Sequence, residues 1–293
     1  MRQGLFAAAG AYFIWGLFPL YWKLLATVPA LEIMAHRIVW CAAVVAIWLS
    51  VREGWGWTRT LSPRLVGMLV GSAALISVNW WLYIWAVNSG HIVETSLGYF
   101  INPLVSVLLG VFVLREKLNP RQWLAVGIAT LGVLWLTLQA GRLPWIALLL
   151  AVSFGGYGFI RKLAVVPAVQ GLMVESGLLL LPALAFLTYQ ATQGLGAFGH
   201  IGLGTDALLM TAGLITALPL VLFAFGARRI PLSTVGILQY LAPTLQLICG
   251  VLIFHEPFTR SQAIGFGCIW AALVVYALDG LWRTRRLGPI RSA

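Results

Sequence analysis

Polar side chains spaced one helical turn apart, inside long apolar stretches, are the residues of this sequence best suited to chemistry. One face of the helix expected around residues 92–114 carries four of them, at spacings of three and four: Thr95, Tyr99, Asn102 and Ser106. Hydroxyl, phenol and amide groups bind small molecules through hydrogen bonds. A single polar stripe is also typical of a seam between packed helices, so this stripe alone leaves both interpretations open.

The same pattern recurs 140 residues further along the chain. Without a gap, this offset aligns six identical residues: Pro103 with Pro243, Gly110 with Gly250, Val111 with Val251, Glu116 with Glu256, Gln122 with Gln262 and Gly127 with Gly267. Most of these are proline, glycine, charged or amide residues, which backbone geometry and helix ends fix more than general hydrophobicity does. The sequence therefore predicts two related halves, residues 1–140 and 141–293.

The second half carries its own polar stripe. The positions of Tyr99, Asn102 and Ser106 are taken there by Gln239, Ala242 and Gln246. Two stripes in register across related halves favour a cavity that faces a substrate over a simple helix seam.

Prolines within the expected helices leave backbone carbonyls without their usual amide partners. Three such carbonyls are those of Trp15, Tyr99 and Gln239, four residues before Pro19, Pro103 and Pro243. In lipid, each freed carbonyl needs another donor, from a neighbouring helix, a water or a substrate. A kink that serves only packing is the other interpretation.

The composition is that of a membrane protein. Hydrophobic residues make up 61% of the 293 positions and charged residues only 9%, whereas charged residues are about 25% of soluble domains. A spanning helix needs about 20 mostly apolar residues. Ten stretches qualify: Leu5 to Trp22, Ile33 to Val51, Leu65 to Val87, Ile92 to Leu114, Trp123 to Leu138, Leu143 to Ile160, Leu172 to Tyr189, Ala207 to Ala227, Ile230 to Phe254 and Ala263 to Leu281.

We therefore predict an all-α membrane protein with ten transmembrane helices in the lipid bilayer. A count of nine is the alternative, because the fifth stretch is short and the eighth and ninth nearly adjoin. The net charge of +11 is distributed as the positive-inside rule predicts for a membrane protein. With the N-terminus in the cytoplasm, fifteen of the nineteen Lys and Arg residues fall on the inner side. This distribution places both termini in the cytoplasm and excludes nucleic acid as a partner.

Five helices in each half, an odd number, mean that the second half enters the membrane in the opposite orientation. The fourth helix ends on the inner side in basic residues: Arg115, Lys117 and Arg121. Their equivalents at the outer end of the ninth helix carry no fixed positive charge: His255, Pro257 and Ser261. Inverted repeats are the architecture of many secondary transporters, whose substrate sites lie near the midplane between the halves.

Arg37 and Glu175 are charged side chains deep within the expected spans. Arg37 lies about 9 Å below the outer end of the second helix, and a central arginine costs about 2.5–3.5 kcal/mol on insertion scales. It needs a partner or a watery cavity, unless it snorkels to the interface or forms a fixed ion pair. Glu175 either exchanges protons during transport or pairs with a neighbour. Glu116 and Glu256, at helix ends, are expected to fasten helices to loops.

Asn79 and Tyr83 lie one turn apart in the third expected helix. Buried amides and phenols are costly without partners, so this pair either bonds to a neighbouring helix or lines a cavity. The same helix opens with Gly67 and Gly71, a GxxxG pattern that predicts a close helix contact.

No enzymatic motif is present in the sequence. It has no GK[ST] phosphate loop and no HExxH helix, and its four histidines share no metal-ligand spacing. Cys41, Cys249 and Cys268 fall inside expected spans without CxxC pairing, which indicates small core residues. We expect neither catalysis nor a metal or cofactor.

Two long runs resemble a known family. Residues 79–91, NWWLYIWAVNSGH, and residues 94–104, ETSLGYFINPL, are similar to the RarD-type permeases of the EamA family, in the drug/metabolite transporter superfamily. Shorter similar runs are AHRIVW at 35–40 and QYLAPT at 239–244. The resemblance implies ten helices in two EamA repeats, residence in the bacterial cytoplasmic membrane, and export or exchange of small metabolites. It also draws attention to residues already chosen for their polarity: Asn79, Tyr83, Tyr99 and Asn102.

We therefore expect a secondary transporter, with a channel or a non-transporting membrane scaffold as the alternative. Substrate contacts are expected from five residues: Asn79, Tyr99, Asn102, Gln239 and Tyr240. Trp15 and Tyr83 would shape the apolar wall, and Arg37 would either attract an anionic group or hold the second helix. An aromatic and amide lining suits a small amphipathic metabolite, with a proton or a counter-substrate as the coupling partner.

Overall fold

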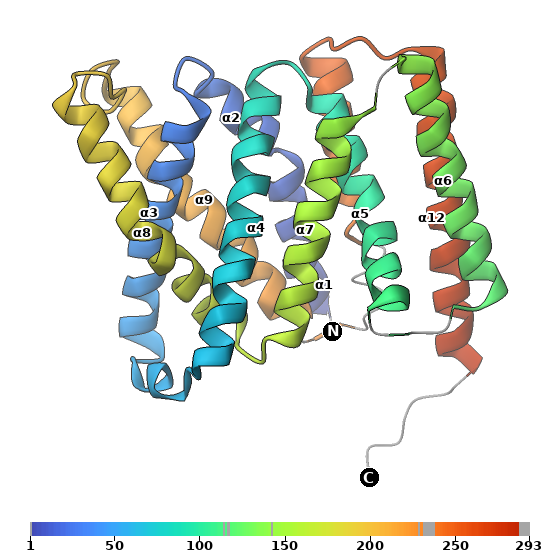
Figure 1. Cartoon of the computed structure of the whole chain (residues 1–293), viewed down its shortest axis with the longest axis horizontal. Helices are drawn as coiled ribbons and strands as arrows, with labels where there is room; N and C mark the ends of the chain where they lie inside the picture. The colour runs from blue at the N-terminus through green and yellow to red at the C-terminus, as the bar shows by residue number, and fades with distance from the viewer. Residues whose placement is uncertain are drawn as a thin grey trace.

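The structure, a computed structural model, describes residues 2–113, 115, 118–141, 143–227, 229–230 and 238–286, and its regular elements there are helices (Figure 1). Their bounds are α1 Arg2–Gly16, α2 Phe18–Leu24, α3 Ala30–Arg52, η1 Gly56–Thr60, α4 Pro63–Asn88, α5 Ile92–Phe112, α6 Pro120–Ala140, α7 Trp145–Leu163, α8 Ala168–Thr192, α9 Leu203–Ala227, α11 Leu241–Ile248, η2 Cys249–Ile253 and α12 Arg260–Arg286.

The expected membrane character is confirmed. Within the described ranges, eight helical segments are long and apolar enough to cross a membrane; α1 and α2 together form the first, and α3 to α9 form the rest. The ninth expected span holds the shorter apolar stretch Leu241–Ile253, while its residues 231–237 lie outside the described residues. The tenth falls within α12.

The helices stand side by side in one bundle (Figure 1). α6 and α12 pack against each other at one edge, and α3, α8 and α9 lie at the other. Between them, α4 packs on α7 while α9 packs on α1, and α5 packs on α7 while α11 packs on α1. α4 and α9 run in opposite directions, and the start of α1 lies at the same end of the bundle as the end of α12 (Figure 1).

Local backbone geometry repeats at the offset of 140 residues that the sequence shows. Arg115 and His255 are the two non-glycine residues with positive φ in the described chain, at 56° and 54°. α6 starts with a capping box in which Asn119 and Gln122 bond each other's backbone N–H. Thr259 and Gln262 form the same reciprocal pair at the start of α12. Such caps satisfy orphan amides at a helix start and fix where the helix begins.

The first membrane segment is broken at Leu17, between α1 and α2. Pro19 leaves the Trp15 carbonyl without its usual amide partner. The expectation that this carbonyl finds another donor is confirmed, because Nε2 of Gln246 in α11 donates to it at 3.2 Å. A residue of the second half therefore closes a gap in the backbone of the first.

Glu256 fastens a helix end, as expected. Its two carboxylate oxygens accept hydrogen bonds from the backbone N–H groups of Ile92 and Val93, at 2.7 and 2.8 Å. These amides open α5, where the helix dipole favours negative charge. Glu94 does the same for α7, accepting from the Ile146 N–H at 3.2 Å. Glu116, the equivalent of Glu256, lies outside the described residues.

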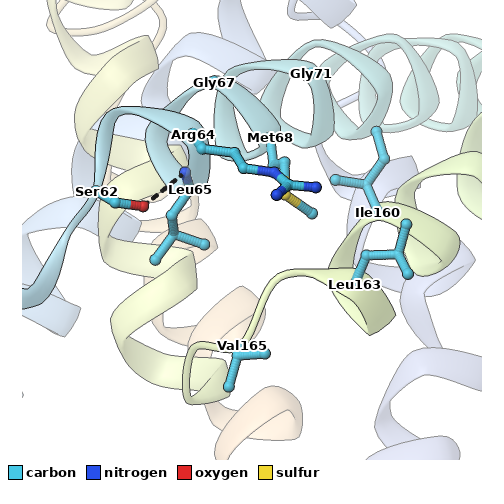
Figure 2. A pocket seen from close by; sticks show the side chains of 9 residues that line it. All are labelled: Ser62, Arg64, Leu65, Gly67, Met68, Gly71, Ile160, Leu163 and Val165. Atoms are coloured by element: carbon cyan, nitrogen blue, oxygen red, sulfur yellow. Dashed lines mark hydrogen bonds between the residues drawn. The ribbon is translucent and has the colours of Figure 1, made fainter.

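The close helix contact predicted from the GxxxG pattern is wrong at Gly67. Nothing lies within 4 Å of the position that a Cβ would take there, while at Gly71 the Ile160 side chain of α7 lies 3.5 Å away. Ile160 keeps α7 apart from α4 at this level, and α7 ends three residues later. The result is a hollow of about 710 Å³ between the start of α4 and the end of α7 (Figure 2).

Replacement of Gln246 by leucine tests the bond that closes the break in the first membrane segment. Gln246→Leu leaves the part-buried Trp15 carbonyl without a donor, which costs about 1–3 kcal/mol of stability. We expect a lower apparent melting temperature in detergent, while Gln193→Leu, an exposed amide after α8, leaves it unchanged. An unaltered melting temperature for Gln246→Leu would show that the carbonyl needs no protein donor.

Candidate substrate site

Arg37 is buried within the bundle, with 4% of its surface exposed. Its Nε donates a hydrogen bond to the Thr216 hydroxyl of α9 at 2.8 Å. Its guanidinium carbon lies 4.0 Å from the centre of the Trp80 ring and 5.3 Å from that of Trp22. The side chain therefore does not snorkel to the interface. Among the described residues, no carboxylate lies within salt-bridge distance of it.

The packing of α3 on α9 sets the depth at which Arg37 meets Thr216. Gly213 lies one turn before Thr216, and a Cβ at Gly213 would come within 2.3 Å of the Trp40 carbonyl carbon. Only glycine permits this approach. The backbones of the two helices are therefore in direct contact next to the Arg37 side chain.

Asn79 is fully buried, and protein groups occupy both ends of its amide. Its Nδ2 donates to the Leu150 carbonyl and to the Ser153 hydroxyl, each at 3.1 Å. Its Oδ1 accepts from the Tyr99 hydroxyl at 3.3 Å. Asn79 thus joins α4 to α7 and α5, and it sets the orientation of the Tyr99 phenol.

Tyr83 and Tyr99 meet edge to face, with ring centres 5.6 Å apart. Tyr99 also meets Phe154 of α7 edge to face, at 5.9 Å. The Tyr83 hydroxyl is buried and forms no hydrogen bond with any residue in the described part of the chain. A buried phenol without a partner is costly, so this hydroxyl is a candidate for contact with a substrate.

Asn102 is half-buried on α5 and faces α7. A Cβ at Gly155 would lie 2.7 Å from the Val105 side chain and 3.6 Å from the Asn102 Oδ1. The glycine therefore lets α7 approach the stripe of α5 closely. Of that stripe, Thr95 bonds the Ile92 carbonyl of its own helix at 2.7 Å.

Trp15 and two residues of the second half lie on or next to α1 and α11, which pack against each other. Trp15 is half-buried and contacts the rings of Tyr12 and Phe223, with centres at 5.4 and 5.8 Å, and these two rings also contact each other. Gln239 and Tyr240 are half-buried and directly precede α11. Tyr240 packs on the same hydrophobic cluster as Leu97 and Ile101 of α5.

Glu175 lies in a different cluster, between α8, α4 and α7. Its carboxylate accepts a hydrogen bond from Ser72 at 2.6 Å and one from Tyr157 at 3.4 Å. It lies 3.7 Å from the Arg161 Nε. Two roles were expected for Glu175, proton exchange and pairing with a neighbour. The structure shows Glu175 paired.

Sequence reasoning missed the partners of Arg37. Thr216 is one of three threonines in a largely apolar helix, 179 residues away in the chain, and nothing local distinguishes it from the other two. Trp80 directly follows Asn79 in the sequence. Its position next to a candidate site residue could have marked it as a possible partner of Arg37. Trp22 carried no signal beyond its position near a span end.

A family model matches most of the chain in two segments, residues 2–138 and 143–278. Its description is the EamA-like transporter family. The chain belongs to this family. The two EamA segments meet near residue 140, where the offset in the sequence also divides the chain.

Relatives of the RarD type match over nearly the full length. Protein RarD of Streptomyces exfoliatus is 49% identical, with 97% of this chain and 91% of that protein covered. Protein RarD of Escherichia coli (strain K12) is 42% identical, with 97% of each covered. The uncharacterized transporter YojE of Bacillus subtilis (strain 168) is 48% identical, with coverage of 95% and 94%.

A solved crystal structure shares the fold at 20% identity. Its TM-score is 0.62, and the match covers 94% of this chain and 98% of that one. The protein is thus a RarD-type EamA permease: a multi-pass bacterial membrane protein and a membrane transporter.

Two substitutions on α4 separate packing from substrate contact. Asn79→Leu leaves the part-buried Tyr99 hydroxyl of α5 without its acceptor and removes both bonds from α4 to α7, and we expect it to lower stability by about 1–3 kcal/mol. Tyr83→Phe removes a hydroxyl that bonds no described residue, so stability should be unchanged or about 1 kcal/mol higher. Apparent melting temperatures in detergent measure both. A larger loss for Tyr83→Phe than for Asn79→Leu would contradict these assignments.

Proposed function

We propose that this EamA permease is a secondary-active transporter of small amphipathic metabolites or drugs that works by alternating access. It would have ten transmembrane helices in two inverted five-helix repeats, residues 1–140 and 141–293. It would reside in the cytoplasmic membrane with both termini in the cytoplasm, as the distribution of basic residues favours.

One observation carries this proposal: local geometry repeats at equivalent positions of helices that run in opposite directions. Left-handed residues stand at Arg115 and His255, and reciprocal caps open α6 and α12. α4 and α9, which are equivalent at the offset of 140 residues, are antiparallel (Figure 1). In transporters built from inverted repeats, each half can adopt the other's conformation, which opens the central site to alternate sides.

The proposed site lies where the two halves meet. Asn102, Tyr99 and Tyr83 would contact the substrate from the first half, Gln239 and Tyr240 from the second, and Trp15 would provide an apolar wall. Asn79 would act through Tyr99, whose hydroxyl it holds at 3.3 Å. Phenols, an indole and amides suit a ligand that is partly aromatic or apolar and partly polar.

Energy for transport would come from a gradient. Proton coupling would use Glu175, because a carboxylate within a span beside Ser72 and Arg161 can change its charge as its partners move. Exchange against a counter-substrate would use the central site itself.

Counterflow in proteoliposomes tests the proposed function. The probe is a labelled metabolite chosen because it raises the melting temperature of the purified protein. We expect saturable uptake that unlabelled metabolite inside the vesicles accelerates. A carrier must reorient its binding site to the outer side before it can take up another molecule, and bound substrate accelerates this step. Flux that never saturates and shows no counterflow would identify a channel, and the absence of any flux would identify a non-transporting scaffold.

The polar stripes make a second test in the same assay. Asn102→Leu and Gln239→Leu should lower counterflow at least tenfold with nearly unchanged abundance in the membrane. Gln193→Leu, after α8, is the matched control with an exposed amide. Loss of both stripe variants from the membrane would mean that the stripes are packing seams.

A further inference from the structure

We infer that the transported metabolite carries an anionic group, a carboxylate on an apolar or aromatic body, and that Arg37 binds this group. The inference rests on the proposed transport function. It assigns a substrate class to the central site and a role to one buried residue.

The charge of Arg37 lacks an anionic counterpart among the described residues. A guanidinium has five N–H donors and stays protonated in proteins. The Nε–H donates to Thr216, and the four N–H groups on the two terminal nitrogens bond no residue in the described ranges. A buried charge is stable only when it is paired and hydrogen-bonded.

The carboxylates of the surrounding helices are bonded to other groups. Glu32, five residues earlier on α3, accepts a hydrogen bond from the Ala197 N–H at 2.6 Å. Glu175 on α8 accepts from Ser72 and pairs with Arg161. The Oε2 atom of Glu32 bonds no residue in the described ranges, but neither carboxylate lies within salt-bridge distance of Arg37 in this conformation.

The aromatic surroundings stabilise the cation without using its donors. Trp80 lies under the guanidinium at 4.0 Å, and Trp22 and Phe18 lie at 5.3 and 5.9 Å. A cation–π contact stabilises a charge less than a charge-assisted pair does in a desolvated site. The rings are not hydrogen-bond acceptors of the usual kind, so the terminal N–H groups remain able to bind a carboxylate in bidentate geometry.

Tyr83 offers a second donor close by. Tyr83 belongs to the same hydrophobic cluster as Phe18 and Trp22, whose rings lie next to the Arg37 guanidinium, and Tyr99 packs against that cluster. The Tyr99 hydroxyl is bonded to Asn79, whereas that of Tyr83 is free of partners in the described chain. A carboxylate at Arg37 would lie beside aromatic rings that can hold the apolar body of the same molecule.

Arg37 also links the two halves. It belongs to α3 of the first half, and its hydrogen bond ends on α9 of the second. An anion bound there would change the contact between α3 and α9, which the proposed transport cycle must rearrange. Arg37 therefore has a position from which bound substrate can influence the exchange of conformations.

Binding of matched acids and amides tests this inference. The probes are indole-3-acetate and phenylpropionate with their uncharged amides, measured by ligand-induced thermal stabilisation of the purified full-length protein. We expect at least one acid to stabilise the wild type and its amide to do so at least tenfold more weakly. Arg37→Gln should abolish this preference, and Arg64→Gln, an exposed arginine at the start of α4, should preserve it.

Arg37→Lys covers the case in which the glutamine variant does not fold. It keeps the charge but loses the planar fork, so the preference for the acid should persist with weaker binding. Equal binding of acid and amide to the wild type, or an unchanged preference in folded Arg37→Gln, overturns the inference.

Counterflow separates this inference from the proposed function. Saturable counterflow of uncharged or cationic metabolites that survives in Arg37→Gln leaves the transporter intact and overturns the anionic substrate class. Arg37-dependent acid binding without counterflow of any acid supports the anion site and overturns transport.

Discussion

In a bilayer, every polar group of the chain has to find its partner within the protein, and the structure of this permease depends on that constraint. The break at Leu17 is tolerated because Gln246 donates to the Trp15 carbonyl. The amides that open α5 are tolerated because Glu256 accepts from them. A helical membrane protein with many prolines and glycines can thus remain stable, provided that each freed backbone group meets a specific side chain.

Many of these partners come from the other half of the chain. Trp15 bonds Gln246, Arg37 bonds Thr216, and Ser96 donates to the Pro243 carbonyl at 2.8 Å. Hydrogen bonds between halves have a double consequence. They stabilise the conformation in the structure, and they are the contacts that must exchange if the halves move relative to each other. The site proposed for substrate lies among them, so a ligand with its own polar groups can replace some of these bonds.

The sequence predicted features that depend on local composition and repetition. Apolar length located the eight described helices that can cross a membrane, and the shared offset predicted two related halves. Proline chemistry predicted that the Trp15 carbonyl needs a donor, but the identity of that donor depends on how α1 lies against α11, which no local pattern encodes. Thr216 could not be predicted as the partner of Arg37 for the same reason, because that contact depends on how α3 packs on α9. Asn79 was selected for its polarity, yet its bonds to α5 and α7 became visible only with the packing.

The GxxxG prediction at Gly67 failed for a related reason, because the motif describes one surface and the bulk of Ile160 decides whether the other can reach it.

Inverted orientation of the halves is the claim on which the transport account rests. The most direct measurement is labelling of single cysteines at positions 115 and 255, in a protein without Cys41, Cys249 and Cys268, by a membrane-impermeant maleimide. The account predicts that position 115 reacts only from the cytoplasmic side and position 255 only from the outside; reaction of both from the same side would contradict it.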